Sequence, residues 1–244
     1  MTHGIFGAGS NWRGIARKLV DRRREWGVVL VDLRLHGRSD AGAPPHTVAA
    51  CASDLAALIA ELGDVRALAG HSFGGKTALA TRALIELPQT WMLDASPSAR
   101  PGAMRDGNSV VAVLELMERL PPTFANRDDF ATAVIDAGHG NALAQWLAMN
   151  LVERDGVYVN RLDLAGIRAL LEDYFALDLW DAAFAPRGDL EVVIADHSSA
   201  LSPADRARLA DAPGHVHSHV VDGNHWLHIE AADEVLELFA TQLR

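Results

Sequence analysis

The sequence that decides the fold is Val65-Arg66-Ala67-Leu68-Ala69-Gly70-His71-Ser72-Phe73-Gly74-Gly75. The apolar run from Val65 predicts a buried strand, and residues 75–86 predict a helix directly after it. Between them, residues 70–74 match Gly-x-Ser-x-Gly, a sharp strand-to-helix turn that needs glycine because neighbouring backbone passes too close for side chains. This turn holds the Ser72 hydroxyl at the carboxyl edge of the sheet, where the first N–H groups of the helix point. An ordinary turn serine is the alternative, but the flanking strand and helix make Ser72 our candidate nucleophile.

Strand-like and helix-like segments alternate on both sides of this turn. Such alternation is typical of strand–helix units that build a parallel sheet, so we predict an α/β protein. Apolar residues on one helical face, followed by Gly63, predict a covering helix over residues 51–62. A second helix is expected over residues 232–243. The other expected strands are Val28–Asp32, Trp91–Asp94, Leu190–Ala195 and His215–Val221.

The middle of the chain, from Pro97 to Arg187, breaks this alternation. It holds helix-like patterns at residues 109–120, 128–136, 142–152 and 162–177, with few strand signals. Prolines and glycine near both ends provide turn points. We therefore predict a core of residues 1–96 and 188–244, interrupted by an all-helical insertion of residues 97–187.

Composition narrows the class of protein. At 244 residues, with 49% hydrophobic and 22% charged residues, the chain is an ordinary globular protein, and no apolar run approaches a membrane span. Its net charge of -10 argues against nucleic-acid binding. Cys51 is the only cysteine, which excludes an internal disulfide and a thiolate metal cluster. The start lacks the pattern of a secretory signal, so we expect a cytoplasmic protein; the sequence leaves the oligomeric state open.

A serine nucleophile requires a base, and the base usually requires a carboxylate. His225 lies in a loop directly after the last predicted strand and before the last helix, from which it could reach Ser72. We therefore expect His225 to be the base and His228 to be a structural neighbour. Three other histidines alternate along the last strand and could present a metal pair. Because no acidic partner recurs at their spacing, we predict no metal site; they are His215, His217 and His219.

Together these features resemble the α/β-hydrolase superfamily. The similarity is to the small acyl-ester hydrolases with a helical cap, a branch that includes bacterial carboxylesterases and mitochondrial abhydrolase-domain relatives. It rests on six blocks in order along nearly the whole chain. They are His3–Trp12, Asp32–Ser39, Gly70–Lys76, Leu93–Pro97, Asn150–Gly156 and Asn224–His228.

This resemblance implies a serine hydrolase for small acyl esters or thioesters, with residues 97–187 as the cap and no cofactor. It also implies an oxyanion hole made by the N–H groups of Ile5 and Phe73, a pair that tetrahedral chemistry demands. Perhydrolase or C–C hydrolase chemistry on the same residues, and a non-catalytic ligand-binding protein, remain alternatives. We expect an apolar acyl group of short to medium length. Its pocket walls could include Phe124, Trp146, Met149, Tyr174, Phe175 and Trp180.

The acid is where the chain departs from the commonest family pattern. Many members carry the aspartate shortly after the penultimate strand, in a Gly-x-x-Asp setting, and here Ser198 occupies that place. Asp94, 22 residues beyond Ser72, occupies the other position from which this fold recruits an acid. We favour Asp94 and keep Asp196 as the alternative.

The family pattern also leads us to expect a gap in the sheet. In the family, a hairpin and a third strand precede the His3-Gly4 loop, and here only Met1 and Thr2 precede it. That third strand would lie between the strands that end at Asp32 and Ala69. Without it, buried N–H and C=O groups at two strand edges would lack partners, each at a cost of about 1–3 kcal/mol. We therefore expect a truncated or misassigned start, with the Ile5 donor poorly anchored; otherwise the two edges close on each other, or another chain donates a strand.

Overall fold

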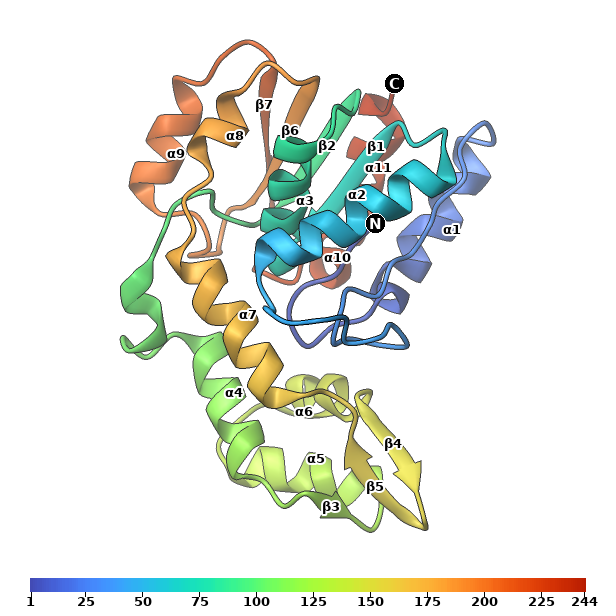
Figure 1. The fold of residues 1–244 in the computed structure, drawn as a ribbon, viewed down its shortest axis with the longest axis vertical. Coiled ribbons are helices and arrows are strands. Elements are labelled where there is room, and N and C mark those ends of the chain that lie inside the picture. The colour runs from blue at the N-terminus through green and yellow to red at the C-terminus, as the bar shows by residue number, and fades with distance from the viewer.

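A four-stranded parallel sheet forms the upper part of the molecule in Figure 1, a computed structural model that describes residues 1–244. Its order is β1-β2-β6-β7, and neighbours are parallel throughout, with Gly70 beside Met92 and Met92 beside Val192. All five residues of the central strand β2 are buried. The α/β prediction is confirmed. The strands are β1 (Ala67–His71), β2 (Gln89–Leu93), β6 (Asp189–Ala195) and β7 (Val216–Val221).

Helices cover both faces of this sheet because side chains alternate along each buried strand. Trp91 of β2 packs with Leu19 and Phe239, on the face covered by α1 and α11. Met92, the next residue, packs with Leu79 on the face covered by α3, α8 and α9. None of these helices, nor any other in the chain, is long and apolar enough to cross a membrane. The core helices are α1 (Arg13–Arg22), α2 (Val48–Leu62), α3 (Phe73–Leu84), α8 (Trp180–Phe184), α9 (Pro203–Ala210), α10 (Leu227–Glu230) and α11 (Ala232–Gln242), with a 3-10 helix η1 (Gly9–Trp12).

The elements from α4 to α7 form the lower part of Figure 1, while α8 packs on the parallel sheet. Our all-helical prediction for residues 97–187 is wrong. A three-stranded antiparallel sheet, β3-β5-β4, accompanies the helices. Its hairpin turns at Asp155 and Gly156, whose φ angles of 51° and 81° suit a two-residue turn between strands. The strands are β3 (Thr123–Phe124), β4 (Leu151–Arg154) and β5 (Val157–Asn160); the helices are η2 (Pro101–Met104), α4 (Ser109–Arg119), α5 (Arg127–Asp136), α6 (Asn141–Ala148) and α7 (Leu164–Ala176).

The strand predicted over residues 28–32 forms only one bridge, from Val31 to Thr2. Met1 and Thr2 lie between this segment and β1. Thr2 N–H donates to Ala69 O (2.8 Å), and Val31 N–H donates to Met1 O (3.0 Å). The segment is therefore extended but lacks the continuous partner that a strand requires.

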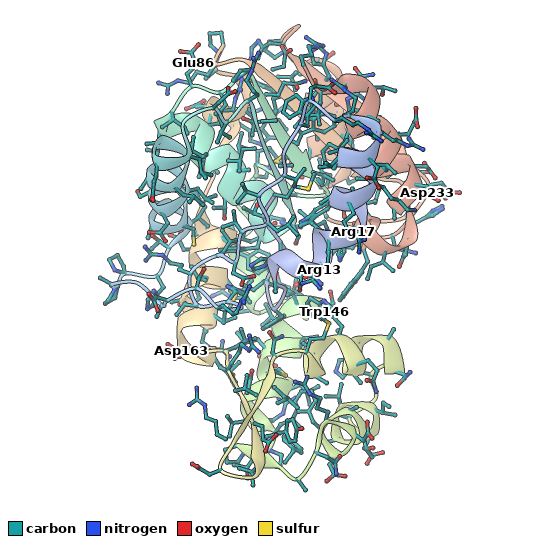
Figure 2. The ribbon with its side chains drawn as sticks, turned by 90° about the vertical axis from the view of Figure 1, so that its right-hand side faces the viewer. Arg13, Arg17, Glu86, Trp146, Asp163 and Asp233 are labelled. Carbon is teal, nitrogen blue, oxygen red and sulfur yellow. The ribbon has the colours of Figure 1, made fainter.

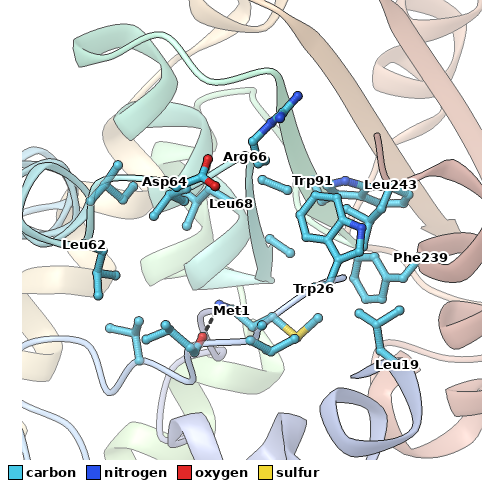
Figure 3. Close-up of a pocket in the computed structure, with 18 of the residues that line it drawn as sticks. Met1, Leu19, Trp26, Leu62, Asp64, Arg66, Leu68, Trp91, Phe239 and Leu243 are labelled. Carbon is cyan, nitrogen blue, oxygen red and sulfur yellow. Dashed lines mark hydrogen bonds between the residues drawn. The ribbon is translucent and has the colours of Figure 1, made fainter. Parts of the chain in front are cut away.

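An apolar cavity of about 700 Å³ lies beside Met1, between the residue 28–31 segment and β1. Seventeen of its 23 lining residues are hydrophobic. Figure 3 shows Leu62 on one side of the cavity and Trp26 and Phe239 on the other. The expected gap in the sheet is thus present, and the two strand edges do not close on each other. Trp91 and Phe239 at its wall are buried and pack against each other, with ring centres 4.8 Å apart.

Candidate active site

Ser72 lies in the sharp turn between β1 and α3. Its φ is +54°, a conformation that few side chains adopt, and its N–H donates to Leu93 O (2.8 Å). The flanking glycines are required by space: a Cβ on Gly70 would lie 2.1 Å from Gly74 O, and one on Gly74 would lie 2.5 Å from His3 O. The turn therefore fixes the Ser72 hydroxyl at the carboxyl edge of the sheet, as the glycine pattern predicts.

The structure brings Ser72, His225 and Asp94 into one line of hydrogen bonds. His225 lies in the loop between β7 and α10, and its Nε2 is 2.9 Å from Ser72 Oγ. Its Nδ1 is 2.6 Å from Asp94 Oδ2. Because an ionised carboxylate only accepts, this network assigns the imidazole proton to Nδ1 and leaves Nε2 to accept from the serine hydroxyl.

Asp94 is fully buried directly after β2, with a φ of +43°. Besides His225, its carboxylate accepts from Ala195 N–H (3.2 Å) and from Ser198 Oγ (2.5 Å). Ser198 occupies the place where the family pattern led us to look for an acid. It instead donates a hydrogen bond to Asp94, which follows the neighbouring strand β2. Asp196 is absent from this network: its side chain is 59% exposed and lies 3.8 Å from Arg206.

The N–H groups of Ile5 and Phe73 donate no hydrogen bond within the protein. Phe73 is the first residue of α3, so its N–H has no partner inside the helix. Both residues line the same cavity as Ser72. Two unoccupied backbone donors therefore border the nucleophile, as an oxyanion-binding site needs.

The loop that carries Ile5 is held from three directions, in contrast to our expectation of poor anchoring. Buried His3 accepts from Leu33 N–H (3.0 Å) at Nε2 and donates to Gly4 O (2.7 Å) at Nδ1. Gly7 N–H donates to Gly4 O within the loop. From the insertion, buried Asn150 Nδ2 donates to Phe6 O (2.8 Å), where Phe6 has a φ of +63°.

Buried histidines surround the site and are neutral, a feature that sequence patterns did not reveal. His71 Nε2–H donates to the main-chain O of His225 (2.6 Å), which ties the base's loop to the residue before Ser72. Burial lowers the pKa of His71 well below its usual value. Burial also lowers the pKa of His3 to about 4 and that of His36 to about 3.

Ser72 opens into a cavity of about 680 Å³ between the core and the insertion. Trp146, Tyr174 and Phe175 line it, as the sequence suggests, and Trp146 lies at the junction of the two parts in Figure 2. Trp146 meets Trp226 edge to face, with ring centres 4.5 Å apart. Three aromatic or sulfur-containing residues expected in the wall are not part of it: Phe124, Met149 and Trp180.

The β7 histidines lie apart from this cavity. His217 comes near two acids of the adjacent strand β6, Asp189 and Glu191, a grouping that spacing along one strand does not reveal. These acids already have other partners, since His219 Nε2 is 2.7 Å from Glu191 and Arg244 is 2.6 Å from Asp189. These side-chain contacts account for the group.

Fold and site together define an α/β hydrolase, and the chain belongs to the alpha/beta hydrolase family, whose sequence model matches residues 1–238. The resemblance and fold class read from the sequence are confirmed. Among curated proteins, the sn-1-specific diacylglycerol lipase ABHD11 of Danio rerio is 28% identical over 249 residues, covering 98% of this chain and 75% of the relative.

Solved structures share the fold. A marine microorganism esterase superposes with a TM-score of 0.82 at 22% identity, covering 97% of this chain and 91% of its own. The thioesterase domain from the curacin biosynthetic pathway gives a TM-score of 0.74 at 22% identity, covering 99% and 89%.

Proposed function

We propose that this chain is a serine hydrolase that cleaves carboxylic esters or thioesters through an acyl-enzyme on Ser72. The observation that carries the proposal is the line of two hydrogen bonds from Ser72 Oγ through His225 to Asp94, at 2.9 and 2.6 Å. Nucleophile, base and orienting carboxylate in this order are the arrangement that activates a neutral serine.

Each residue of the site has its own role in the reaction. Ser72 Oγ attacks the carbonyl carbon while His225 Nε2 takes its proton, and the carbonyl oxygen becomes an oxyanion. The N–H groups of Ile5 and Phe73 bind that oxyanion; loss of one such donor costs about 3–4 kcal/mol. His225 then protonates the leaving group, and water, activated by the same imidazole, releases the acid from Ser72. Each step uses groups of the chain, so the mechanism calls for no cofactor.

Asp94 acts through His225 and stays ionised. It holds the Nδ1–H tautomer and stabilises the imidazolium that forms when the serine proton moves. Ser198 and Ala195 keep the carboxylate in place during this change. We assign the substrate to the ester and thioester class because the relatives include a lipase, an esterase and a thioesterase. Within residues 97–187, α4 to α7 and the small sheet form the cap that walls the acyl pocket.

The proposal predicts that Ser72→Ala and His225→Ala each lower ester hydrolysis by about 10⁴-fold or more, because triad residues act as a unit. Steady-state hydrolysis of 4-nitrophenyl esters and labelling by a fluorophosphonate probe measure this. Ser53→Ala, an exposed serine on α2, is the matched control and keeps full activity and labelling.

Two outcomes contradict the proposal. Retained hydrolysis in a pure Ser72→Ala preparation would exclude the acyl-enzyme. A wild-type chain that is folded but neither labelled nor active would identify the alternative, a non-catalytic ligand-binding protein.

A further inference from the structure

One cation borders the acyl pocket without an anionic partner. Arg100 lies in the linker between β2 and α4 and lines the same cavity as Ser72. Its side chain is partly buried, and no carboxylate oxygen lies within the 4.0 Å of an ion pair. In a chain of net charge -10, an arginine that lines the pocket without an ion pair is an unusual feature.

Arg100 is held in place by its backbone and by two aromatic neighbours, Tyr174 and Phe175. Its N–H donates to Phe175 O (2.6 Å), and its carbonyl accepts from Ala103 N–H (2.9 Å). The guanidinium lies 5.6 Å from the centre of the Phe175 ring. The guanidinium also bonds the Tyr174 hydroxyl, which takes one of its five N–H donors and leaves others to bind an anion.

The acids nearby keep their negative charge, but none lies within ion-pair distance of Arg100, and each accepts its hydrogen bonds from other groups. Asp173 accepts from Val48 N–H, and Asp178 accepts from Trp180 N–H. Asp205 accepts from Ser96, Ser98 and Ser202. Across the pocket, Glu230 accepts from Asn224 N–H.

A second buried cation, Lys76, lies near Arg100, and Asp173, Asp178 and Asp205 offset the charge of the two. Buried Lys76 donates to Ser98 O (3.0 Å) and Tyr174 O (2.8 Å), so it too lacks a carboxylate partner. Burial lowers the pKa of Lys76 to about 8, and repulsion from Arg100 contributes to this lowering. An anion beside Arg100 would relieve that repulsion.

The position of Arg100 relative to the nucleophile follows from two aromatic contacts. The Phe73 ring, next to Ser72, lies 5.8 Å from the Tyr174 ring. Arg100 interacts with the Tyr174 side chain and opposes the rise that burial causes in the Tyr174 pKa. Phe73, Tyr174 and Arg100 therefore follow one another along the wall of one cavity.

We infer that Arg100 binds a carboxylate at the far end of the acyl chain, so that half-esters and half-thioesters of short dicarboxylic acids form a preferred substrate class. The inference rests on the proposed function of Ser72. Guanidinium and carboxylate match in geometry and form two parallel hydrogen bonds. The apolar walls then contact the methylene groups between the two carbonyl carbons, and Arg100 selects chain length.

The test uses monomethyl esters of four-, five- and six-carbon dicarboxylic acids, each beside the compound in which a terminal amide replaces the free carboxylate. At pH 7 the pair has the same shape and differs only in charge. For at least one chain length, the wild-type kcat/KM is expected to favour the carboxylate. In Arg100→Gln that preference falls by about 10²-fold while hydrolysis of the amide changes little, because a buried charge pair has lost one partner. Arg100→Lys keeps part of the preference, and Arg105→Gln, an exposed neighbour, keeps all of it.

Melting temperatures and fluorophosphonate labelling separate this inference from the proposed function. If Arg100→Gln is labelled normally and keeps the wild-type ratio of carboxylate to amide hydrolysis, the role of Arg100 is wrong and the proposed function of Ser72 is unaffected. A wild-type enzyme that prefers the amide at every chain length would overturn the role of Arg100 as well. If Arg100→Gln fails to fold, the salt dependence of the wild-type ratio decides: the inference requires the preference for the carboxylate to fall as salt rises.

Discussion

The fully buried carboxylate of Asp94 accepts hydrogen bonds from three donors. Burying such a group is costly unless it is hydrogen-bonded, and here His225, Ser198 and Ala195 all donate to it. Sequence reasoning brought both Asp94 and Asp196 to strand ends at the same edge, because β2 and β6 are neighbours. The sequence does not show which of the two side chains points toward His225, so both aspartates stayed candidates.

The assignment of the acid predicts that Asp94→Asn lowers kcat/KM by about 10³–10⁴-fold, because the amide disfavours the Nδ1–H tautomer of His225. Asp196→Asn is expected to cost less than tenfold, since its side chain is exposed. Steady-state kinetics of the two variants, with melting temperatures to confirm folding, make the comparison. The reverse ranking would move the acid to Asp196.

Helices and strands were predicted correctly where the local sequence pattern agrees with the contacts that the segment makes in the folded protein. The helices over residues 51–62 and 232–243 formed as expected, because one apolar face specifies each and Gly63 ends the first. The hairpin at Asp155-Gly156 was missed, although a two-residue turn between alternating residues is a strong signal. The segment at residues 28–32 shows the opposite case: it is apolar enough for a strand, but a strand also needs partners on its edges.

Asn150 joins the cap to the core at the oxyanion loop. Its side chain is 5% exposed and donates to Phe6 O, next to the residue whose N–H we assign to the oxyanion hole. We expect Asn150→Ala to lower kcat about tenfold with little change in KM, because one hydrogen bond that fixes a strained loop is worth about 1 kcal/mol or slightly more. Asn141→Ala, an exposed residue on the first turn of α6, is the control.

Affinity for a trifluoromethyl ketone, whose adduct with Ser72 carries an oxyanion, separates this role from a general loss of packing. Asn150→Ala should weaken that inhibitor in proportion to kcat. Unchanged inhibitor affinity would show that the bond from Asn150 does not position the oxyanion donors.

Over the whole molecule, the placement of buried groups was the least predictable property. Composition and strand order follow from local sequence, but burial depends on which segments from distant parts of the chain meet. His3, His36 and His71 lie in three separate segments, yet all are buried near one edge of the sheet, with His3 and His36 in ring contact at 4.9 Å. Their spacing in the sequence gives no sign of this cluster.

This cluster predicts loss of stability in mild acid. Burial lowers the pKa of His3 to about 4 and of His36 to about 3, and that of His71 well below its usual value, whereas all three titrate near 6.5 in the unfolded chain. Below pH 6.5 these three histidines therefore bind up to three more protons in the unfolded chain than in the native protein. They lower the free energy of unfolding as pH falls, by up to about 4 kcal/mol per pH unit, and the slope begins to flatten when native His3 protonates near pH 4.

Urea unfolding at several pH values between 7.5 and 4.5 measures how the free energy of unfolding changes with pH. Substitution of His36 tests the contribution of one histidine. His36 donates to Arg34 O through Nδ1, while its Nε2 is buried without a partner. We expect His36→Asn to reduce the slope by about 1.4 kcal/mol per pH unit, the contribution of one proton. His197→Gln, an exposed histidine, should leave it unchanged. Equal slopes in the wild type and His36→Asn would show that His36 takes up its proton in the folded protein, because the site opens to water before the chain unfolds.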